Sequence, residues 1–378
     1  MMTTFHSSSP LRRHAGRFSR LISAVALLPL TIGTCGLALG LVLSGLALAG
    51  YPPLAIVSRW VDGSIGGIYP LTNSLADACP LLLTGLAAGI AFRGGVLNIG
   101  AQGQFLLGAM VTVGLSTRWL IFHSAPPVII LAILAGTFAG GLWALLASVL
   151  ERYRSVPIVL STILLNFVAL YVVRAILQGP LQAGGTPAPQ SPQIAPAYWL
   201  PVFIPFTSFH LGIPIAFVLA VLFYALNQRT TFGFESLVIG LNPGAARLAG
   251  IRVTRKQFLV MFMSGCCAGL GGALQVLGVT HFMTGSFGNY GYAGIAVALL
   301  GRLNPLGIAG AALFFGMLDT GALRVEESSL ALPHAVVNVV KAVVILLMLL
   351  LSAYLLGRKL RTRQVDPSPP GDRGSDKL

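Results

Sequence analysis

This sequence contains few charged residues. Only 9% of its 378 residues are Asp, Glu, Lys or Arg, and Asp and Glu together number 10. Soluble globular domains carry roughly 25% charged residues, with which they cover a water-facing surface. A chain this poor in charge cannot do so, and the composition therefore excludes an ordinary soluble domain.

Cysteine and histidine are too few and too dispersed for a metal site, a disulfide framework or a catalytic centre. The four cysteines lie in or beside apolar stretches without any Cys-x-x-Cys spacing, and buried thiols of this kind behave as small hydrophobic side chains. The six histidines are scattered in tails and loops, and they form no nucleophile–base arrangement. The phosphate-binding pattern of a P-loop is missing as well. We therefore expect a chain that is not an enzyme and carries no cofactor of its own.

The sequence is instead rich in long apolar runs. Hydrophobic residues make up 55% of the chain, and a run of about 20 apolar residues is long enough to cross a bilayer as a helix. The sequence predicts an all-α, polytopic transmembrane helix bundle with about ten spans. The candidate spans are 21–49, 75–92, 103–122, 128–150, 156–177, 211–227, 257–279, 290–300, 303–320 and 333–356. The eighth is too short to cross at a rise of 1.5 Å per residue, so we expect a broken or re-entrant element near 280–300.

Basic residues indicate how the chain is oriented. The formal net charge is +14, and most Lys and Arg lie in loops and tails, where positive charge marks the cytoplasmic side. Alternating the spans from a cytoplasmic N-terminus places most of these residues, and both termini, inside. This predicts a cytoplasmic basic tail over 1–20, a transmembrane domain over 21–356 and a second cytoplasmic basic tail over 357–378. The positive charge is thus a topological signal, and no nucleic-acid-binding pattern accompanies it.

The first apolar run also resembles the core of a signal peptide, because it ends in Ala47-Leu48-Ala49. The run is about twice the length of a typical signal core. We therefore interpret it as a retained first span.

Two long loops separate the spans. The external loop, 178–210, contains seven prolines and no charged residue; it suits either an external partner or the membrane surface. In the cytoplasmic loop, 228–256, Asn242 and Pro243 form a helix start, since Asn caps a helix and Pro fits its first position. Gly250 supplies the stop. A helix of about two turns is marginal alone in water, so it rests either on the bundle or on a partner subunit.

At this loop the sequence resembles the permeases of ABC importers, and in particular the simple-sugar and nucleoside permeases, which are relatives of the ribose and branched-chain amino-acid permeases. The resemblance runs from about residue 75 to 350, and three stretches carry it. They are Ala91-Phe92-Arg93-Gly94-Gly95-Val96-Leu97-Asn98-Ile99-Gly100-Ala101-Gln102-Gly103-Gln104, Gly240-Leu241-Asn242-Pro243-Gly244-Ala245-Ala246-Arg247-Leu248-Ala249-Gly250-Ile251, and Gly294-Ile295-Ala296-Val297-Ala298-Leu299-Leu300-Gly301-Arg302-Leu303-Asn304-Pro305-Leu306-Gly307. One departure is Pro157-Ile158, which stands where the family usually has an Asn-Glu pair, so a carboxylate near the inner mouth is missing.

The resemblance implies a division of labour. ABC ATPase subunits bind and hydrolyse ATP, an extracytoplasmic solute-binding protein delivers the solute, and this chain forms the pathway with a second, identical or homologous permease in the bacterial inner membrane. The loop 228–256 then contacts the ATPase. Residues assigned to this coupling are Asn242, Pro243, Ala246, Arg247 and Gly250. For Arg247, contact with lipid headgroups is the alternative.

Uncharged amides at membrane depth mark a candidate pathway, because buried polar groups are costly and amides both donate and accept hydrogen bonds. They are Asn98, Gln102, Gln104, Asn166, Gln275, Asn289 and Asn338. Each also suits hydrogen bonding between helices. The form of the motifs favours a nucleoside as cargo, followed by a monosaccharide or another small polar solute. A secondary carrier driven by an ion gradient is the alternative from another class, but it commonly needs intramembrane acids that this chain has almost none of.

Overall fold

The computed structural model describes residues 50–119, 124–185, 188–285 and 287–327, with scattered positions among 40–48 and 336–350. The chain divides into two compact units, and the larger comprises Ala55–Val337. The predicted first and last spans and both basic tails lie outside the described residues or in the smaller unit. The larger unit holds most of the described residues.

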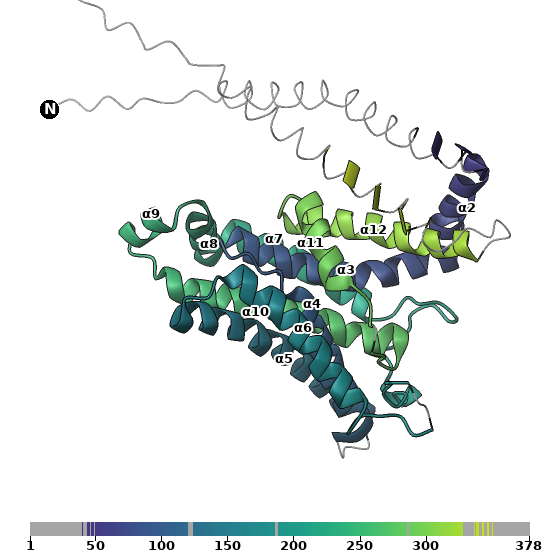
Figure 1. Cartoon of the computed structure of the whole chain (residues 1–378), viewed down its shortest axis with the longest axis horizontal. Helices are drawn as coiled ribbons and strands as arrows, with labels where there is room; N and C mark the ends of the chain where they lie inside the picture. Colours follow the sequence, from purple (N-terminus) through teal and green to yellow (C-terminus); the bar gives the residue numbers. More distant parts are fainter. Residues whose placement is uncertain are drawn as a thin grey trace, which may run out of the picture. The chain divides into compact units, whose positions relative to one another are not determined.

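Helices dominate the part of the chain that the structure describes, as the sequence predicts (Figure 1). The first half contains α2 (Pro53–Ile65), α3 (Ile68–Arg93), α4 (Ala101–Gly114) with a π-helical turn (Leu115–Trp119), α5 (Ala125–Arg154) and α6 (Ile158–Leu177). The second half contains α7 (Gly212–Arg229), α8 (Thr231–Leu241), α9 (Pro243–Leu248), α10 (Val253–Gln275) with a π-helical turn (Val276–Thr280), α11 (Tyr290–Leu300) and α12 (Pro305–Glu326). A short 3-10 turn, Pro196–Tyr198, lies in the loop between α6 and α7.

Among the described residues, six helices are long and apolar enough to cross a membrane: α3, α5, α6, α7, α10 and α12. The sequence predicts eight spans in this part of the chain, and two of these predicted spans are not among the six helices. The predicted span 103–122 begins as the 14-residue helix α4, whose first turn carries Gln102 and Gln104. The predicted short element 290–300 is α11, with 11 residues. Each of the eight predicted segments contains a helix among its described residues, but the helices α4 and α11 are too short to qualify as spans on their own.

The centre of the unit is built from α3 and α10, which are buried along most of their length. In Figure 1, α3 lies between α11 and α12 on one side and α4 and α10 on the other. The outer helices α5, α6 and α7 instead expose many of their apolar side chains, including Phe138, Leu142, Tyr171 and Val218. Exposed apolar area on this scale is typical of a lipid-facing surface and not of a water-facing one.

Glycines let α5 and α10 pack backbone to backbone. A Cβ on Gly140 would lie 2.5 Å from the carbonyl oxygen of Gly265, and one on Gly269 would lie 2.6 Å from that of Gly136. The sequence pairs 136–140 and 265–269 therefore pack against each other. This is how membrane helices gain dispersion energy without a hydrophobic driving force.

The break predicted near 280–300 is confirmed. The π-helical turn after α10 ends at Thr280, His281 takes a left-handed conformation (φ 59°), and the described residues between His281 and the start of α11 at Tyr290 form no helix. Irregular backbone at membrane depth is tolerated only where protein or a cavity covers it. Part of that cover is the loop 178–210, whose backbone N–H groups at Ser191 and Ile194 donate to the carbonyls of Met283 and His281 at 2.9 and 2.8 Å.

His210 ends this loop and is 1% exposed. Burial lowers its pKa from the ordinary value of 6.5 to about 4, with a smaller contribution from His281. The imidazole is therefore neutral at neutral pH, and its Nδ1 accepts a hydrogen bond of 3.1 Å from the backbone N–H of Gly212 at the start of α7. It acts as a buried cap at the α7 start.

Candidate translocation cavity and coupling segment

Two helix starts meet inside the unit, those of α4 and α11. The side chain of Gln102 joins them: its Nε2 donates to the carbonyl of Gly288 at 2.6 Å, and its Oε1 accepts from the N–H of Gly291 at 2.8 Å. Gly291 lies so close to the α4 backbone that a Cβ there would overlap the backbone of Gln102. The first turn of α11 is thus fixed to the first turn of α4.

A cavity of about 460 Å³ opens beside this junction. Its walls come from α4, α6 and the segment that leads into α11. The lining residues are Gln102, Leu106, Asn166, Phe167, Leu170, Arg174, Gly285, Phe287, Gly288, Asn289 and Tyr292. Three of the seven predicted pathway amides are among them, together with three aromatic rings and one guanidinium. Such a volume is in the range of small-molecule sites, which combine apolar walls with a few polar groups.

The cavity is open on one side, because some of its lining residues are exposed. Asn289 is exposed, and Phe167 and Tyr292 are 51% and 41% exposed. Asn166 lies deeper, and its amide is shared with the protein: Nδ2 donates to the carbonyl of Ile99 at 2.9 Å, and Oδ1 accepts from the N–H of Gly103 at 2.8 Å. The open side leaves room for a wall supplied by another protein.

Asn98 and Gln104 do not line this cavity; they bind each other. Their amides exchange two hydrogen bonds of 3.0 and 3.1 Å, and Asn98 Nδ2 also donates to Ser264 Oγ in α10 at 2.8 Å. Asn98 Oδ1 additionally accepts from the N–H of Gly100. Both side chains are buried, so this network holds the loop between α3 and α4 against α10.

The two remaining amides lie elsewhere. Gln275 is buried in α10, where its Nε2 lies 3.4 Å from the hydroxyl of Tyr290. Asn338 is exposed and belongs to the smaller unit. Within the larger unit, the structure therefore brings together Gln102, Asn166 and Asn289 at the cavity and places Asn98, Gln104 and Gln275 in other contacts.

The short helix predicted at Asn242-Pro243 is confirmed as α9. Asn242 caps it by accepting from the N–H groups of Gly244 and Ala245 at 3.0 and 3.1 Å, and Pro243 is its first residue. At its end the N–H of Gly250 donates to Arg247 and that of Ile251 donates to Ala246, both at 3.0 Å. Gly250 has φ 79°. This is a Schellman motif, in which a left-handed glycine satisfies the last carbonyls of a helix.

Only Ala246 of α9 is buried; it packs with Ile239 and Val253. Arg247 is exposed, and two apolar side chains beside it are nearly free of contacts: Leu248 is 93% exposed and Leu241 is 77% exposed. The helix α8 precedes α9 in this loop, and the sequence interpretation did not anticipate it. The segment α8–α9 therefore presents an apolar and basic surface outward.

The coupling segment touches the α3–α4 loop directly, through glycine. Gly95 (φ 76°) faces Gly240 at the end of α8, and a Cβ on Gly95 would lie 3.0 Å from the Cα of Gly240. A Cβ on Gly240 would overlap the carbonyl of Arg93. The first and second sequence motifs are thus in backbone contact. On its other side α8 is tied to α10 by an ion pair between Glu235 and Lys256.

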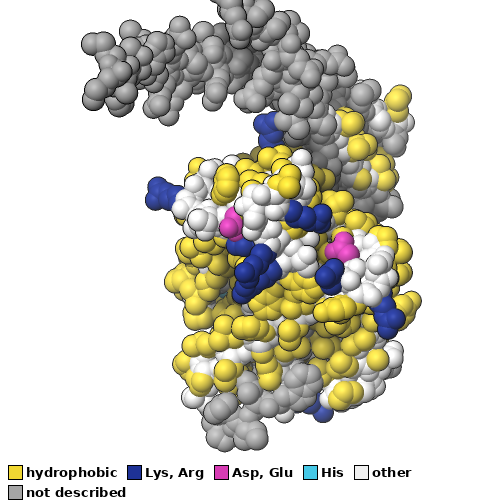
Figure 2. Space-filling view, turned by 90° about the vertical axis from the view of Figure 1, so that its left-hand side faces the viewer, with side chains coloured by type: hydrophobic (Ala, Val, Ile, Leu, Met, Phe, Trp, Pro, Cys, Tyr) yellow, Lys and Arg dark blue, Asp and Glu magenta, His cyan; other side chains and the backbone are white. Residues whose placement is uncertain are grey.

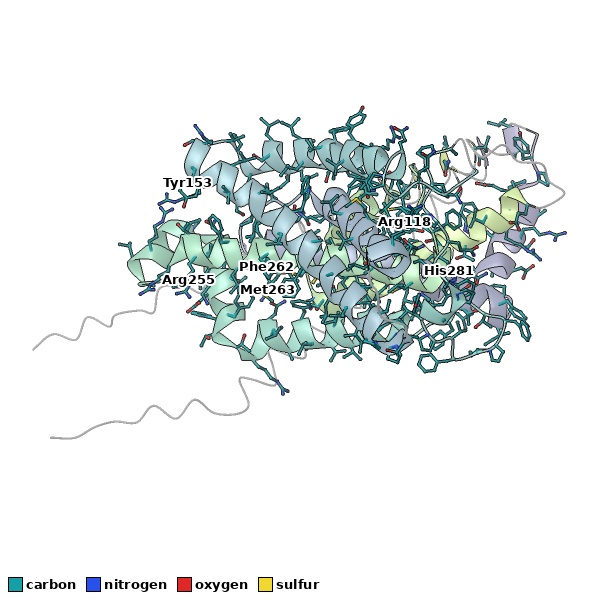
Figure 3. All side chains as sticks on the ribbon, turned by 90° about the horizontal axis from the view of Figure 1, so that it is seen from below. Arg118, Tyr153, Arg255, Phe262, Met263 and His281 are labelled. Carbon is teal, nitrogen blue, oxygen red and sulfur yellow. The ribbon has the colours of Figure 1, made fainter. Side chains whose placement is uncertain are left out.

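The end of the unit that carries α8 and α9 is basic. Figure 2 views this end, where Lys and Arg side chains gather and acidic ones are sparse. The exposed arginines of this part are Arg152, Arg154, Arg229, Arg247, Arg252 and Arg255. Figure 3 shows Tyr153 and Arg255 together at this end, while Arg118 and His281 lie toward the other. The asymmetry agrees with the predicted orientation, in which the basic end faces the cytoplasm.

Sequence reasoning missed several of these positions. Arg174, Phe287 and Tyr292 line the cavity, and Leu241 and Leu248 are the exposed apolar side chains of the coupling segment. Arg174 offered a signal, because it is a charge at the end of an otherwise apolar run. The aromatic and leucine residues offered none, since their types are common throughout the chain.

Comparison with known proteins agrees with this architecture. The family model described as the branched-chain amino acid transport system / permease component matches residues 71–353. A guanosine ABC transporter permease of Bacillus subtilis is 33% identical, covering 85% of this chain and 92% of the relative. A glucose ABC transporter permease of Haloferax volcanii is also 33% identical, over 82% of this chain and 85% of the relative. A nucleoside ABC transporter permease of Lactococcus lactis is 30% identical, over 84% and 89%.

Two features of the structure agree with the comparisons: six helices long enough to cross a membrane, and the short capped helix α9. The family model matches most of the chain. The chain is a multi-pass membrane protein and belongs to the permease family of ABC transporters.

Proposed function

We propose that this permease imports a nucleoside, and that the cavity at the α4–α11 junction is part of its pathway. The observation that carries the proposal is the combination of three aromatic side chains with amides in one cavity. A nucleoside has a flat heteroaromatic base, which suits Phe167, Phe287 or Tyr292, and hydroxyl and ring groups that suit amides. Two of the relatives above are named for guanosine or nucleoside transport.

A monosaccharide is the second candidate. Its support is the glucose permease of Haloferax volcanii, which is as similar to this chain as the guanosine permease. The amides of the cavity would serve sugar hydroxyls equally well. The aromatic residues distinguish the two cargoes, because a sugar lacks a planar base.

The proposed mechanism needs three further proteins or subunits. An external binding protein delivers the solute to the face that carries the loop 178–210. A second permease closes the open side of the cavity, where Phe167, Asn289 and Tyr292 are exposed. ATPase subunits bind the segment α8–α9 on the cytoplasmic side and move it as they close. In this arrangement both termini lie in the cytoplasm and the membrane is the bacterial inner membrane.

Docking of α9 on an ATPase is supported by its surface. Leu241 and Leu248 offer exposed apolar anchors, and Arg247 offers a cation between them. Asn242, Pro243 and Gly250 shape the helix, and Ala246 attaches it to the bundle. A partner with an apolar groove and acidic rim fits this surface, since buried apolar anchors and complementary charge dominate protein interfaces.

Reconstitution of the complete transporter in vesicles tests both halves of the proposal. We expect ATP-dependent accumulation of labelled nucleoside that unlabelled nucleoside abolishes and unlabelled glucose does not. Arg247→Glu should lower uptake at least tenfold with unchanged protein yield, whereas Arg152→Glu, on the same basic face, should leave uptake near wild type. Glucose accumulation instead would make the cargo a sugar. Normal uptake by Arg247→Glu would contradict the coupling role, and uptake driven by an ion gradient without ATP would contradict the importer.

A further inference from the structure

Arg174 lies where two cavities meet. The cavity of about 460 Å³ described above has a smaller neighbour of about 300 Å³, lined by Arg174, Gln178, Ala188, Pro189, Gln190, Thr284 and Gly285. Arg174 and Gly285 line both of them. The smaller cavity is walled by the loop 178–210, so it lies on the outer side of the larger one. A solute entering from that side would pass Arg174 before it reached Asn289.

The residues that line both cavities, here called the neck, are fixed by hydrogen bonds. Arg174 Nε donates to the carbonyl of Gly285 at 3.1 Å, and the N–H of Gly285 donates to the carbonyl of Pro189 at 2.9 Å. A Cβ on Gly285 would lie 3.0 Å from Cγ of Pro189, closer than ordinary van der Waals contact. The guanidinium is therefore held by the carbonyl of Gly285, and Gly285 is itself bound to the loop 178–210.

Among the described residues, no Asp or Glu lines either cavity. The sequence contains no Asp or Glu between Glu151 and Glu235, and none between Glu235 and Asp319. These two stretches supply α6, the loop 178–210 and the segment 281–300. The remaining wall comes from Gln102 and Leu106 of α4. The positive charge of Arg174 is thus not neutralised by the residues that a passing solute would touch.

We infer that Arg174 is a charge filter at the outer neck of the pathway, which admits neutral and anionic solutes and repels cations. A guanidinium stays charged at all relevant pH values and is a donor only, and a fixed charge in low-dielectric surroundings acts strongly on a nearby ion. Fixed arginines set such electrostatic barriers in narrow pores. The inference rests on the proposed import function for the direction of passage, and it narrows the cargo to nucleosides or other solutes without a cationic group.

Charged thiol reagents test the filter without assuming any cargo. Asn289→Cys places a thiol in the larger cavity, and the complete transporter in membranes is treated from outside with a negatively charged and a positively charged methanethiosulfonate of similar size. Protein with only its native cysteines gives the background. We expect the anionic reagent to react faster, and its advantage over the cationic one to fall about tenfold when Arg174→Gln is added, because one charge at the neck is lost. Arg174→Lys should preserve the preference.

Gln178 provides a matched pair of variants that leave Arg174 in place. It is exposed and lines only the smaller cavity. Gln178→Glu should shift the reagent ratio toward the cation and Gln178→Lys toward the anion, so the filter can be tested even where Arg174→Gln reduces protein yield. An unchanged ratio in every variant would overturn the inference. Nucleoside uptake, measured on the transporter without the Asn289→Cys substitution, is a separate result: its absence together with a shifted reagent ratio would refute the cargo and leave the filter standing.

Discussion

Single side chains at membrane depth divide into those that hold the protein together and those that face a cavity. Asn98 shows why sequence alone could not separate them. Its main partner outside its own loop, Ser264, is 166 residues away, and nothing local reveals that contact. An amide side chain in an apolar run therefore indicates either a structural hydrogen bond or a contact with a transported solute. Only the packing of the folded protein decides between the two. Asn98 and Gln104 are buried and paired, whereas Asn289 is exposed at the cavity.

Asn98→Ala should lower the stability of the folded protein by about 2 kcal/mol or more, because Gln104, Ser264 and the N–H of Gly100 would each lose a buried partner. The thermal unfolding midpoint in detergent measures this loss. Asn289→Ala is the matched control and should leave the midpoint within error while reducing solute uptake. Equal midpoints for Asn98→Ala and wild type would contradict the structural role of the network.

Helices and turns were predicted best where their signals are local. Asn242-Pro243 and Asn304-Pro305 are both capped helix starts, with Asn304 Oδ1 accepting from the N–H of Leu306 at 3.1 Å. Each signal lies within a few residues of the feature that it specifies. The helix α8 was missed because its sequence, Thr231–Leu241, reads as loop between two longer apolar runs. Its start nevertheless has a local signal, because Thr230 Oγ1 accepts from the N–H of Gly233 at 3.3 Å. The helix buries Gly233, Ser236 and Ile239.

Gly140→Ala should weaken the contact of α5 with α10, since the new Cβ would lie 2.5 Å from the carbonyl of Gly265 and 2.7 Å from the Cα of Gly269. Overpacking of this kind costs typically about 1–3 kcal/mol. The yield of monodisperse protein after extraction in detergent is the measurement. Gly310→Ala in α12 is the control, because nothing lies within 4 Å of a Cβ there. Equal yields for the two variants would show that the glycine contact is dispensable.

At the scale of the whole molecule, the sequence predicted the class of protein and its helical architecture, and the orientation stays a prediction. The class and the architecture both follow from the composition of long stretches of the sequence, so a wrong assignment at a few residues does not change them. The cavity was not predictable to the same extent, since it is assembled from α4, α6 and the segment before α11, which are far apart in the chain. Of the amides proposed for a pathway, Gln102, Asn166 and Asn289 converge because the break after α10 brings the start of α11 against α4.

The orientation can be checked with two exposed side chains at opposite ends. Tyr153 is 76% exposed at the basic end, and Phe206 is 94% exposed in the loop 178–210. In intact cells a membrane-impermeant maleimide should label Phe206→Cys and not Tyr153→Cys, and the second variant should react only after the membrane is made permeable. The background from native cysteines is measured on unmodified protein. The reverse labelling pattern would invert the topology and place α9 outside.

The contact between Gly95 and Gly240 has a mechanical consequence. A contact between side chains can absorb a displacement by a change of rotamer, whereas Gly95 and Gly240 have no side chains that could do so. A displacement of α8 and α9 is therefore passed directly to the α3–α4 loop. In this loop the carbonyl of Ile99 accepts the hydrogen bond of Asn166 at the cavity. In the proposed mechanism, a displacement of α8 and α9 by an ATPase would therefore reach the cavity as movement of one of its walls, through the backbone contact between Gly95 and Gly240.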